Sequence, residues 1–148
     1  MIQSHKITPF LWFDGQAREA AELYCSIFKE SKIVSANSMS VTFELEGTRL
    51  VAFNGGPMFK FTEAVSFMVA CETQDEVDYY WDRLGARGQF SRCGWLKDRF
   101  GLSWQVVPVV LPELLGSPDR DKAGRAMAAM MKMGKLEIAE LRAAHEGI

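Results

Sequence analysis

Residues 7–28, ITPFLWFDGQAREAAELYCSIF, join a strand pattern to a helical pattern. The run from Ile7 to Phe13 is almost entirely apolar and rich in residues that favour strands, and the tight Asp14-Gly15 step ends it. From Gln16 onward the apolar residues recur at steps of three and four, which is the period of a helix with one buried face. The segment therefore predicts a strand that is followed directly by an amphipathic helix.

Three short strands are expected after this helix. Side-chain alternation places them at Ile33–Ser40, Val41–Glu46 and Arg49–Asn54. A hairpin turn at Glu46-Gly47 joins the last two, and Gly55-Gly56-Pro57 ends the third. Residues 1–57 thus predict a β-α-β-β-β module.

The same order of elements returns after a linker at Met58–Glu63. The pattern predicts a strand at Val65–Cys71, a helix at Gln74–Leu84, and strands at Gly88–Trp95, Leu96–Arg99 and Leu102–Val110. An internal repeat at a spacing of about 55 residues indicates two units of equal plan that can close side by side. We therefore expect one α+β domain over residues 1–148, in which βαβββ modules at 1–57 and 64–111 form a cup-shaped mixed sheet.

Residues 112–148 form a helical tail of a different kind. Ser117 can act as an N-cap, Pro118 suits the first helical position, and a methionine-rich helix is expected to run to about Met133. Gly134 is expected to end it, and Leu136–Ala144 predicts a final short helix. An amphipathic tail outside the two modules suits covering the sheet or binding a second subunit.

Composition and charge exclude several classes of function. The chain has 148 residues, 48% of them hydrophobic, and a formal charge of −2, so one buried core is expected and there is no basic field for a nucleic acid. The first residues lack the order of a signal peptide, and no apolar run is long enough to span a membrane. We expect a cytoplasmic protein. Cys25, Cys71 and Cys93 show no C-x-x-C spacing, which favours structural thiols.

Four separated motifs resemble those of a known family. They are Ile7-Thr8-Pro9-Phe10-Leu11-Trp12-Phe13-Asp14-Gly15, Phe53-Asn54-Gly55-Gly56-Pro57, Cys93-Gly94-Trp95-Leu96-Lys97-Asp98 and Phe100-Gly101-Leu102-Ser103-Trp104-Gln105. Together they closely resemble the PhnB-like family, often labelled 3-demethylubiquinone-9 3-methyltransferase domain proteins, of the vicinal oxygen chelate (glyoxalase and bleomycin-resistance) superfamily. The resemblance implies the cup-shaped sheet, pairing into a homodimer and, in the superfamily's enzymes, a divalent metal that acts as a Lewis acid.

The ligands that the resemblance implies for such a metal are missing from this sequence. In the superfamily's final strand, Asp98 and Gly101 match the pattern, but Gln105 stands at the position of the ligand glutamate. The other implied positions fall on Thr8 or Pro9, on Ser66, and near Ala52 or Asn54. Neutral donors bind divalent ions far less strongly than carboxylates do. We therefore predict neither a metal nor a cofactor.

Two further chemistries receive little support. The glycines of Asn54–Pro57 lead into Met58 rather than into a helix, so an S-adenosylmethionine site is not predicted. Cys93 has Arg92 and Lys97 nearby but no interior histidine, so a structural role is favoured over a nucleophilic one.

Strand alternation predicts a small-molecule pocket instead. If Gln105 faces the cup, then Ser103 does too, while Trp104 and Val106 face the helices. The residues expected to line the pocket are Phe10, Trp12, Asn54, Ser66, Met68, Ser103 and Gln105. Such a pocket suits a flat, weakly charged ligand, unless Arg49 or Lys97 turns inward. The alternative is that the same side chains fill a closed core.

Three hypotheses for the function stay open. In the first, a metal-independent pocket binds or sequesters a small molecule, as bleomycin-resistance proteins do. In the second, the protein is a lyase, isomerase or dioxygenase whose metal is held by Gln105 and other weak ligands. In the third, the domain is purely structural.

Overall fold

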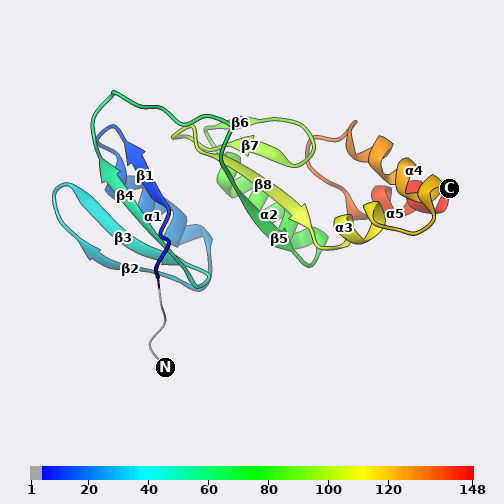
Figure 1. The fold of residues 1–148 in the computed structure, drawn as a ribbon, viewed down its shortest axis with the longest axis horizontal. Coiled ribbons are helices and arrows are strands. Elements are labelled where there is room, and N and C mark those ends of the chain that lie inside the picture. Colours follow the sequence, from blue (N-terminus) through cyan, green and yellow to red (C-terminus); the bar gives the residue numbers. More distant parts are fainter. Residues whose placement is uncertain (1–4) are drawn as a thin grey trace. The chain divides into compact units, whose positions relative to one another are not determined.

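The computed structural model describes residues 5–148, and these fall into two compact units. Unit 1 extends to Phe61 and unit 2 begins at Thr62 (Figure 1). The expected first module lies in unit 1, while the second module and the tail lie together in unit 2. Each unit is described below by itself.

Unit 1 has the predicted β-α-β-β-β order. Its elements are β1 Phe10–Phe13, α1 Ala17–Ile27, β2 Ser31–Ala36, β3 Ser40–Leu45 and β4 Thr48–Asn54. The sheet has the order β1-β4-β3-β2, with β1 parallel to β4 and the other neighbours antiparallel. The first strand begins later than predicted, at Phe10, because Pro9 has no N–H group to donate to a neighbouring strand.

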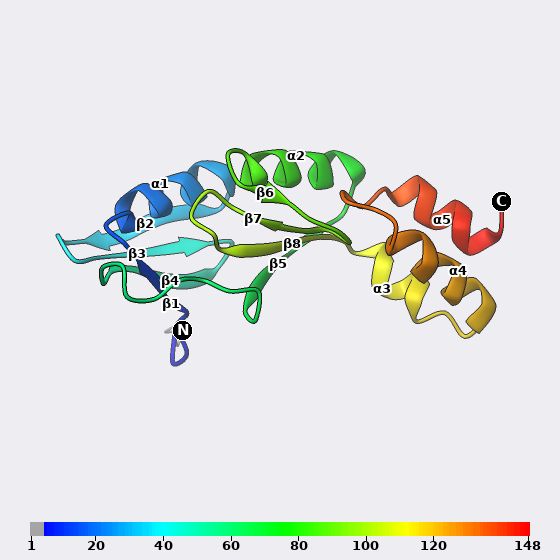
Figure 2. The same ribbon diagram turned by 90° about the horizontal axis from the view of Figure 1, so that it is seen from above.

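One face of this sheet is buried by α1 (Figure 2). The helix contributes Ala17, Ala20, Ala21, Tyr24 and Ile27, all at most 4% exposed. Alternate strand residues meet it, namely Leu11, Phe13, Val41, Phe43, Leu45, Leu50 and Ala52. The period of two in the strands therefore leaves the other half of the side chains on the opposite face, which we call the open face of unit 1.

Unit 2 repeats this plan and confirms the predicted fold. Its first elements are β5 Ser66–Cys71, α2 Gln74–Gly85, β6 Gln89–Phe90, β7 Trp95–Lys97 and β8 Ser103–Pro108. The sheet order β5-β8-β7-β6 matches that of unit 1, again with the first strand parallel to the last. Thr73 caps α2, since its side chain accepts a hydrogen bond from the Glu76 N–H.

The β6 and β7 strands are shorter than predicted because a sharp backbone turn separates them. Cys93 and Gly94 both have positive φ, 59° and 82°, which no strand residue adopts. A Cβ on Gly94 would lie 2.8 Å from the carbonyl oxygen of Val106. Only glycine fits at this close approach of two backbones.

A single buried carboxylate organises the turn between β7 and β8. Asp98 is 3% exposed, and its Oδ1 accepts hydrogen bonds from the N–H groups of Phe100 (2.9 Å) and Leu102 (3.1 Å). Its Oδ2 accepts a third from the indole Nε1 of Trp104 at 2.9 Å. The carboxylate therefore joins the turn to the helix-facing side of β8.

The tail comprises three helices rather than the two predicted: α3 Val110–Leu115, α4 Arg120–Met130 and α5 Ile138–Glu146. They enclose a small core with the end of β8, made of Val107, Val110, Leu111, Leu114, Ala126, Leu136 and Leu141. The predicted start of α4 at Ser117-Pro118 is wrong. Asp119 is the N-cap, because its carboxylate accepts hydrogen bonds from the N–H groups of Asp121 and Lys122.

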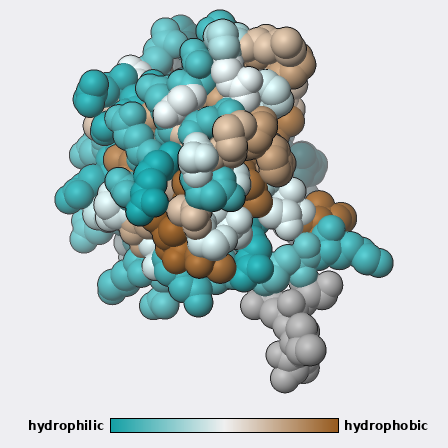
Figure 3. Space-filling model, turned by 90° about the vertical axis from the view of Figure 1, so that its left-hand side faces the viewer, coloured by the Kyte–Doolittle hydropathy of each residue, from teal (hydrophilic) through white to brown (hydrophobic). Residues whose placement is uncertain are grey.

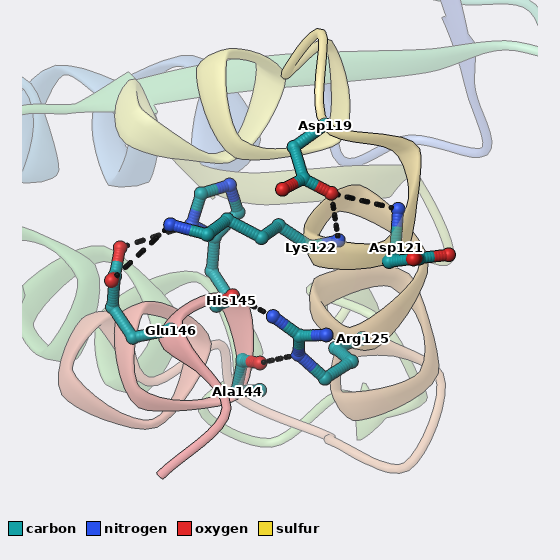
Figure 4. Close-up of polar contacts among 7 residues, drawn as sticks. All are labelled: Asp119, Asp121, Lys122, Arg125, Ala144, His145 and Glu146. Atoms are coloured by element: carbon teal, nitrogen blue, oxygen red, sulfur yellow. Dashed lines mark hydrogen bonds and ion pairs between the residues drawn. The ribbon is translucent and has the colours of Figure 1, made fainter.

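Polar contacts join α4 to the last turn of α5 (Figure 4). Arg125 donates to the carbonyl oxygens of Ala144 at 3.0 Å and His145 at 2.8 Å, which satisfies acceptors at a helix C-terminus. Lys122 lies 3.4 Å from Glu146. These contacts hold the two helices in register without adding to the apolar core.

The segment between α4 and α5 returns to the second module. Met133 and Gly134 accept backbone hydrogen bonds from Cys93 (2.8 Å) and Gly94 (2.9 Å). The Gln74 amide donates to the Leu136 carbonyl at 3.0 Å and accepts from the Ile138 N–H at 2.7 Å. The tail is therefore tied both to α2 and to the turn that precedes β7.

Candidate functional site

The candidate site begins with the face of the unit 2 sheet that α2 does not cover. Strand pairing sets Ser66 opposite Ser103 and Met68 opposite Gln105, and alternation puts all four side chains on this open face. Trp104 and Val106, one residue out of phase, are buried on the helix-covered face. Four of the predicted pocket residues are therefore brought together on one surface.

The neighbouring strand β7 adds two residues that the sequence analysis did not include in the pocket. Trp95 pairs with Gln105 and Lys97 with Ser103, so both project from the open face, while Leu96 between them is buried. The alternation of Trp95, Leu96 and Lys97 was the available signal. The prediction missed this signal because it placed Trp95 and Leu96 in two different strands.

A hollow of about 480 Å³ lies beside β7, and of the predicted pocket residues Ser103 lines it. Its size is that of sites for small organic ligands. The residues that line it are Glu63, Gln89, Ser91, Arg92, Cys93, Trp95, Leu96, Lys97 and Ser103. The hollow thus combines an aromatic wall, several neutral polar groups and charges of both signs.

Ser103 is the most constrained polar group of the hollow. Its side chain is fully buried, and within residues 5–148 its Oγ has no hydrogen-bond partner. Leaving a buried hydroxyl unsatisfied costs about 1–3 kcal/mol. Nearby, Gln105 Nε2 donates to Ser66 Oγ at 3.0 Å, so those two groups satisfy each other.

An ion pair stands at the same hollow. Lys97 Nζ lies 2.7 Å from Glu63 Oε1, and the hydrogen bond from Lys97 lowers the pKa of Glu63 below its ordinary value. Lys97 is the residue directly across from Ser103, so its side chain neighbours the unsatisfied hydroxyl. Glu63 comes from the connection that precedes β5.

The predicted residues in unit 1 separate into two groups. Phe10 and Trp12 project from the open face and contact Phe53, with ring centroids 5.4 and 5.3 Å away. Phe10 is 60% exposed. Apolar residues also lie at the surface that Figure 3 shows. Asn54 lies on the other face, where its Oδ1 accepts a hydrogen bond from the Ala17 N–H at the start of α1.

The glycine-rich turn after β4 packs against the Trp12 ring. The indole Nε1 donates to the Gly56 carbonyl at 2.9 Å, and a Cβ on Gly55 would lie 2.2 Å from the ring. Gly55 is therefore required for this close approach. The turn therefore holds an aromatic side chain in place.

The side chains at the metal positions that the resemblance implies do not fit a divalent ion. Thr8 donates to the His5 carbonyl, Asn54 accepts from the Ala17 N–H, and Gln105 donates to Ser66. All are neutral, and in the described part of the chain no group of three or more His, Cys, Asp or Glu residues is placed to hold a metal. Without carboxylate or imidazole ligands, the cost of dehydrating the ion is not offset.

The cysteine thiols differ in their surroundings. Burial raises the pKa of Cys71 to about 12, and burial also raises the pKa of Cys25. Both thiols therefore stay protonated at neutral pH and are poor nucleophiles. Cys93 lines the hollow, where its backbone is fixed by the hydrogen bond to Met133.

Two βαβββ modules of matching topology, each with an open sheet face, define a glyoxalase-type fold. The model of the family described as 3-demethylubiquinone-9 3-methyltransferase matches residues 5–107. The chain belongs to this PhnB-like family. The match ends at the last strand, so the tail lies outside it. Among curated proteins, none matches the chain.

Solved structures support the same assignment. A putative 3-demethylubiquinone-9 3-methyltransferase, the PhnB protein from Bacillus cereus, is 32% identical, with a TM-score of 0.66 over 71% of this chain and 100% of that one. PA1353 from Pseudomonas aeruginosa is 19% identical, with a TM-score of 0.58 over 71% and 98% of the two chains. FosX from Listeria monocytogenes, a fosfomycin resistance protein solved with Mn(II) and sulfate, is 17% identical, with a TM-score of 0.57 over 78% and 98%. The last two likenesses extend to the fold alone.

Proposed function

We propose that this protein binds or sequesters a small organic molecule without the help of a metal, and that the hollow of unit 2 is part of the binding site. The observation that carries the proposal is the buried, unsatisfied Ser103 hydroxyl at a hollow of about 480 Å³. A ligand that supplies a hydrogen bond there would remove the cost of the unsatisfied group. The Trp95 ring supplies an apolar wall beside it.

The donor chemistry favours this proposal over a metal-dependent lyase, isomerase or dioxygenase. The Gln105 amide faces Ser66, and neither side chain carries a charge. A purely structural role is disfavoured because a closed core would give the Ser103 hydroxyl a partner. The manganese seen in FosX belongs to a protein that is 17% identical to this chain, so it says nothing of the residues here.

Substitutions on the open face test the proposal. Small, flat compounds that raise the melting temperature are first found by a thermal-shift screen of the unmodified protein. Ser103→Ala and Gln105→Ala are each expected to weaken binding of such hits by about tenfold, the equivalent of one lost hydrogen bond. Isothermal titration calorimetry measures the change, with Ser35→Ala, an exposed serine in β2, as the matched control.

Circular dichroism checks that each variant keeps its fold. If all hits bind Ser103→Ala and Gln105→Ala as tightly as they bind the unmodified protein, the open face of unit 2 is not the binding site. A separate test addresses the open face of unit 1, where Trp12→Ala is expected to weaken the binding of any aromatic ligand that occupies that face.

We also propose that the protein forms a homodimer. Exposed apolar side chains support this, among them Met58 (75% exposed), Met131 (58%) and Phe10 (60%). Sedimentation equilibrium at micromolar concentration is expected to give twice the chain mass of 16.7 kDa. A species of 16.7 kDa at that concentration would contradict the dimer.

A cytoplasmic location is proposed on the basis of the thiols. Cys25, Cys71 and Cys93 are free, and free thiols persist in a reducing compartment. Within residues 5–148, no helix combines the length and the apolar character needed to cross a bilayer.

A further inference from the structure

The Glu63–Lys97 pair differs from a simple surface ion pair in where its two partners come from. Lys97 is fixed by the β7 strand, whereas Glu63 lies in the exposed connection at residues 62–65, outside any strand or helix. The Glu63 side chain is 62% exposed, and that of Lys97 is 37% exposed. The carboxylate can therefore leave while the ammonium group keeps its place in the sheet, and exposed pairs of this kind are weak.

Lys97 and Ser103 together form two adjacent donors. They are direct neighbours across β7 and β8, and side chains at such positions start about 4.5–5.5 Å apart. The ammonium group is bound to Glu63, and the Ser103 hydroxyl lacks an acceptor within the described residues. One carboxylate group has two oxygens and could accept from both donors at once.

The charges around the hollow favour an anion once Glu63 has moved. Its charged lining residues are Glu63, Arg92 and Lys97, so removal of the glutamate leaves two cations. Trp95 forms a wall of the same hollow, which suits a flat ring attached to the acid.

From this arrangement we infer that the ligand is an aromatic carboxylate, which binds Lys97 and Ser103 by displacing the Glu63 side chain. The inference rests on the proposed function and names the ligand class for that site. Glu63 acts as an internal competitor that holds the anion position in the free protein. The sequence predicts a charged ligand only if Arg49 or Lys97 turns inward. Lys97 does line the hollow.

Benzoate and benzamide are matched probes for this inference, since they differ mainly in charge. Dissociation constants are measured by following the backbone amide signals of Trp95 and Ser103 in an NMR titration. Glu63→Gln is expected to tighten benzoate binding about fivefold, the upper end for an exposed ion pair. Lys97→Met is expected to weaken it about tenfold. Benzamide binding should change less than twofold in either variant.

Glu146→Gln is the control for Glu63→Gln. Glu146 also pairs with a lysine in unit 2, Lys122 at 3.4 Å, but far along the chain from the hollow, so its loss should leave benzoate binding unchanged. Glu63→Gln changes only an exposed connection, so it provides the test even if Lys97→Met does not fold.

Two failures are distinguishable. If benzamide shifts the Trp95 and Ser103 signals but benzoate affinity is the same in the unmodified protein, Glu63→Gln and Lys97→Met, the displacement of Glu63 is overturned and the binding site stands. If neither probe nor any hit from the thermal-shift screen moves these signals, the proposed function fails at this hollow, and the inference fails with it.

Discussion

Replacement of Asp98 with alanine is expected to lower the free energy of unfolding by about 3–5 kcal/mol. The side chain is 3% exposed and accepts hydrogen bonds from the N–H groups of Phe100 and Leu102 and from the Trp104 indole. Alanine would leave these donors without their acceptor inside the protein. Urea denaturation followed by tryptophan fluorescence measures the loss.

Asp98→Asn is the matched control for this prediction. The amide keeps one oxygen and is expected to lose about half as much stability as alanine does, because it cannot accept all three hydrogen bonds. A loss below about 1 kcal/mol for Asp98→Ala would show that water replaces the carboxylate, and that the turn does not depend on it.

The second large effect is expected at Gly94. Gly94→Ala should destabilise unit 2 by about 3 kcal/mol or more, because the new Cβ would meet the Val106 carbonyl at 2.8 Å and the Leu136 side chain at 3.0 Å. Alanine at this position would also be strained by the positive φ of 82°. The same substitution should loosen the Cys93-Gly94 turn from the tail segment at Met133 and Gly134.

Gly101→Ala separates the effect of the steric contact from that of the backbone strain. Gly101 has a similar φ of 89°, but a Cβ there would have no heavy atom within 4 Å. It should therefore cost only the conformational strain, about 1–2 kcal/mol. Equal losses in the two variants, measured by thermal or urea unfolding, would contradict the importance of the close contact at Gly94.

Most of the fold could be predicted because the strands and helices carry clear periodicities. The buried faces of Ala17–Ile27 and of Ser40–Leu45 follow from steps of three to four and of two. The tail was harder, since Val110–Leu115 contains Pro112 and continues an apolar strand, which concealed a helix. Pro112 sits within the first turn, where its missing N–H costs nothing.

The candidate site could be predicted only where the phase of a strand was clear. Ser103 and Gln105 follow from the alternation of β8, whose neighbours Trp104 and Val106 are plainly apolar. Glu63 belongs to no periodic segment, and its contact with Lys97 depends on tertiary structure that local pattern does not encode. The prediction for Asn54 was wrong. Alternation along β4 places Asn54 on the helix-covered face with Leu50 and Ala52, and Phe10 and Trp12 lie on the opposite face.

Metal-independent binding at the open face of unit 2 is tested most directly by mapping a bound ligand on the protein in excess EDTA. The measurement is an NMR titration with the tightest hit of the thermal-shift screen, repeated with and without the chelator. We expect the largest shifts at Trp95, Lys97, Ser103 and Gln105, and the same dissociation constant in both titrations. Shifts that vanish with EDTA, together with about one equivalent of metal per chain by elemental analysis, would contradict the proposed function.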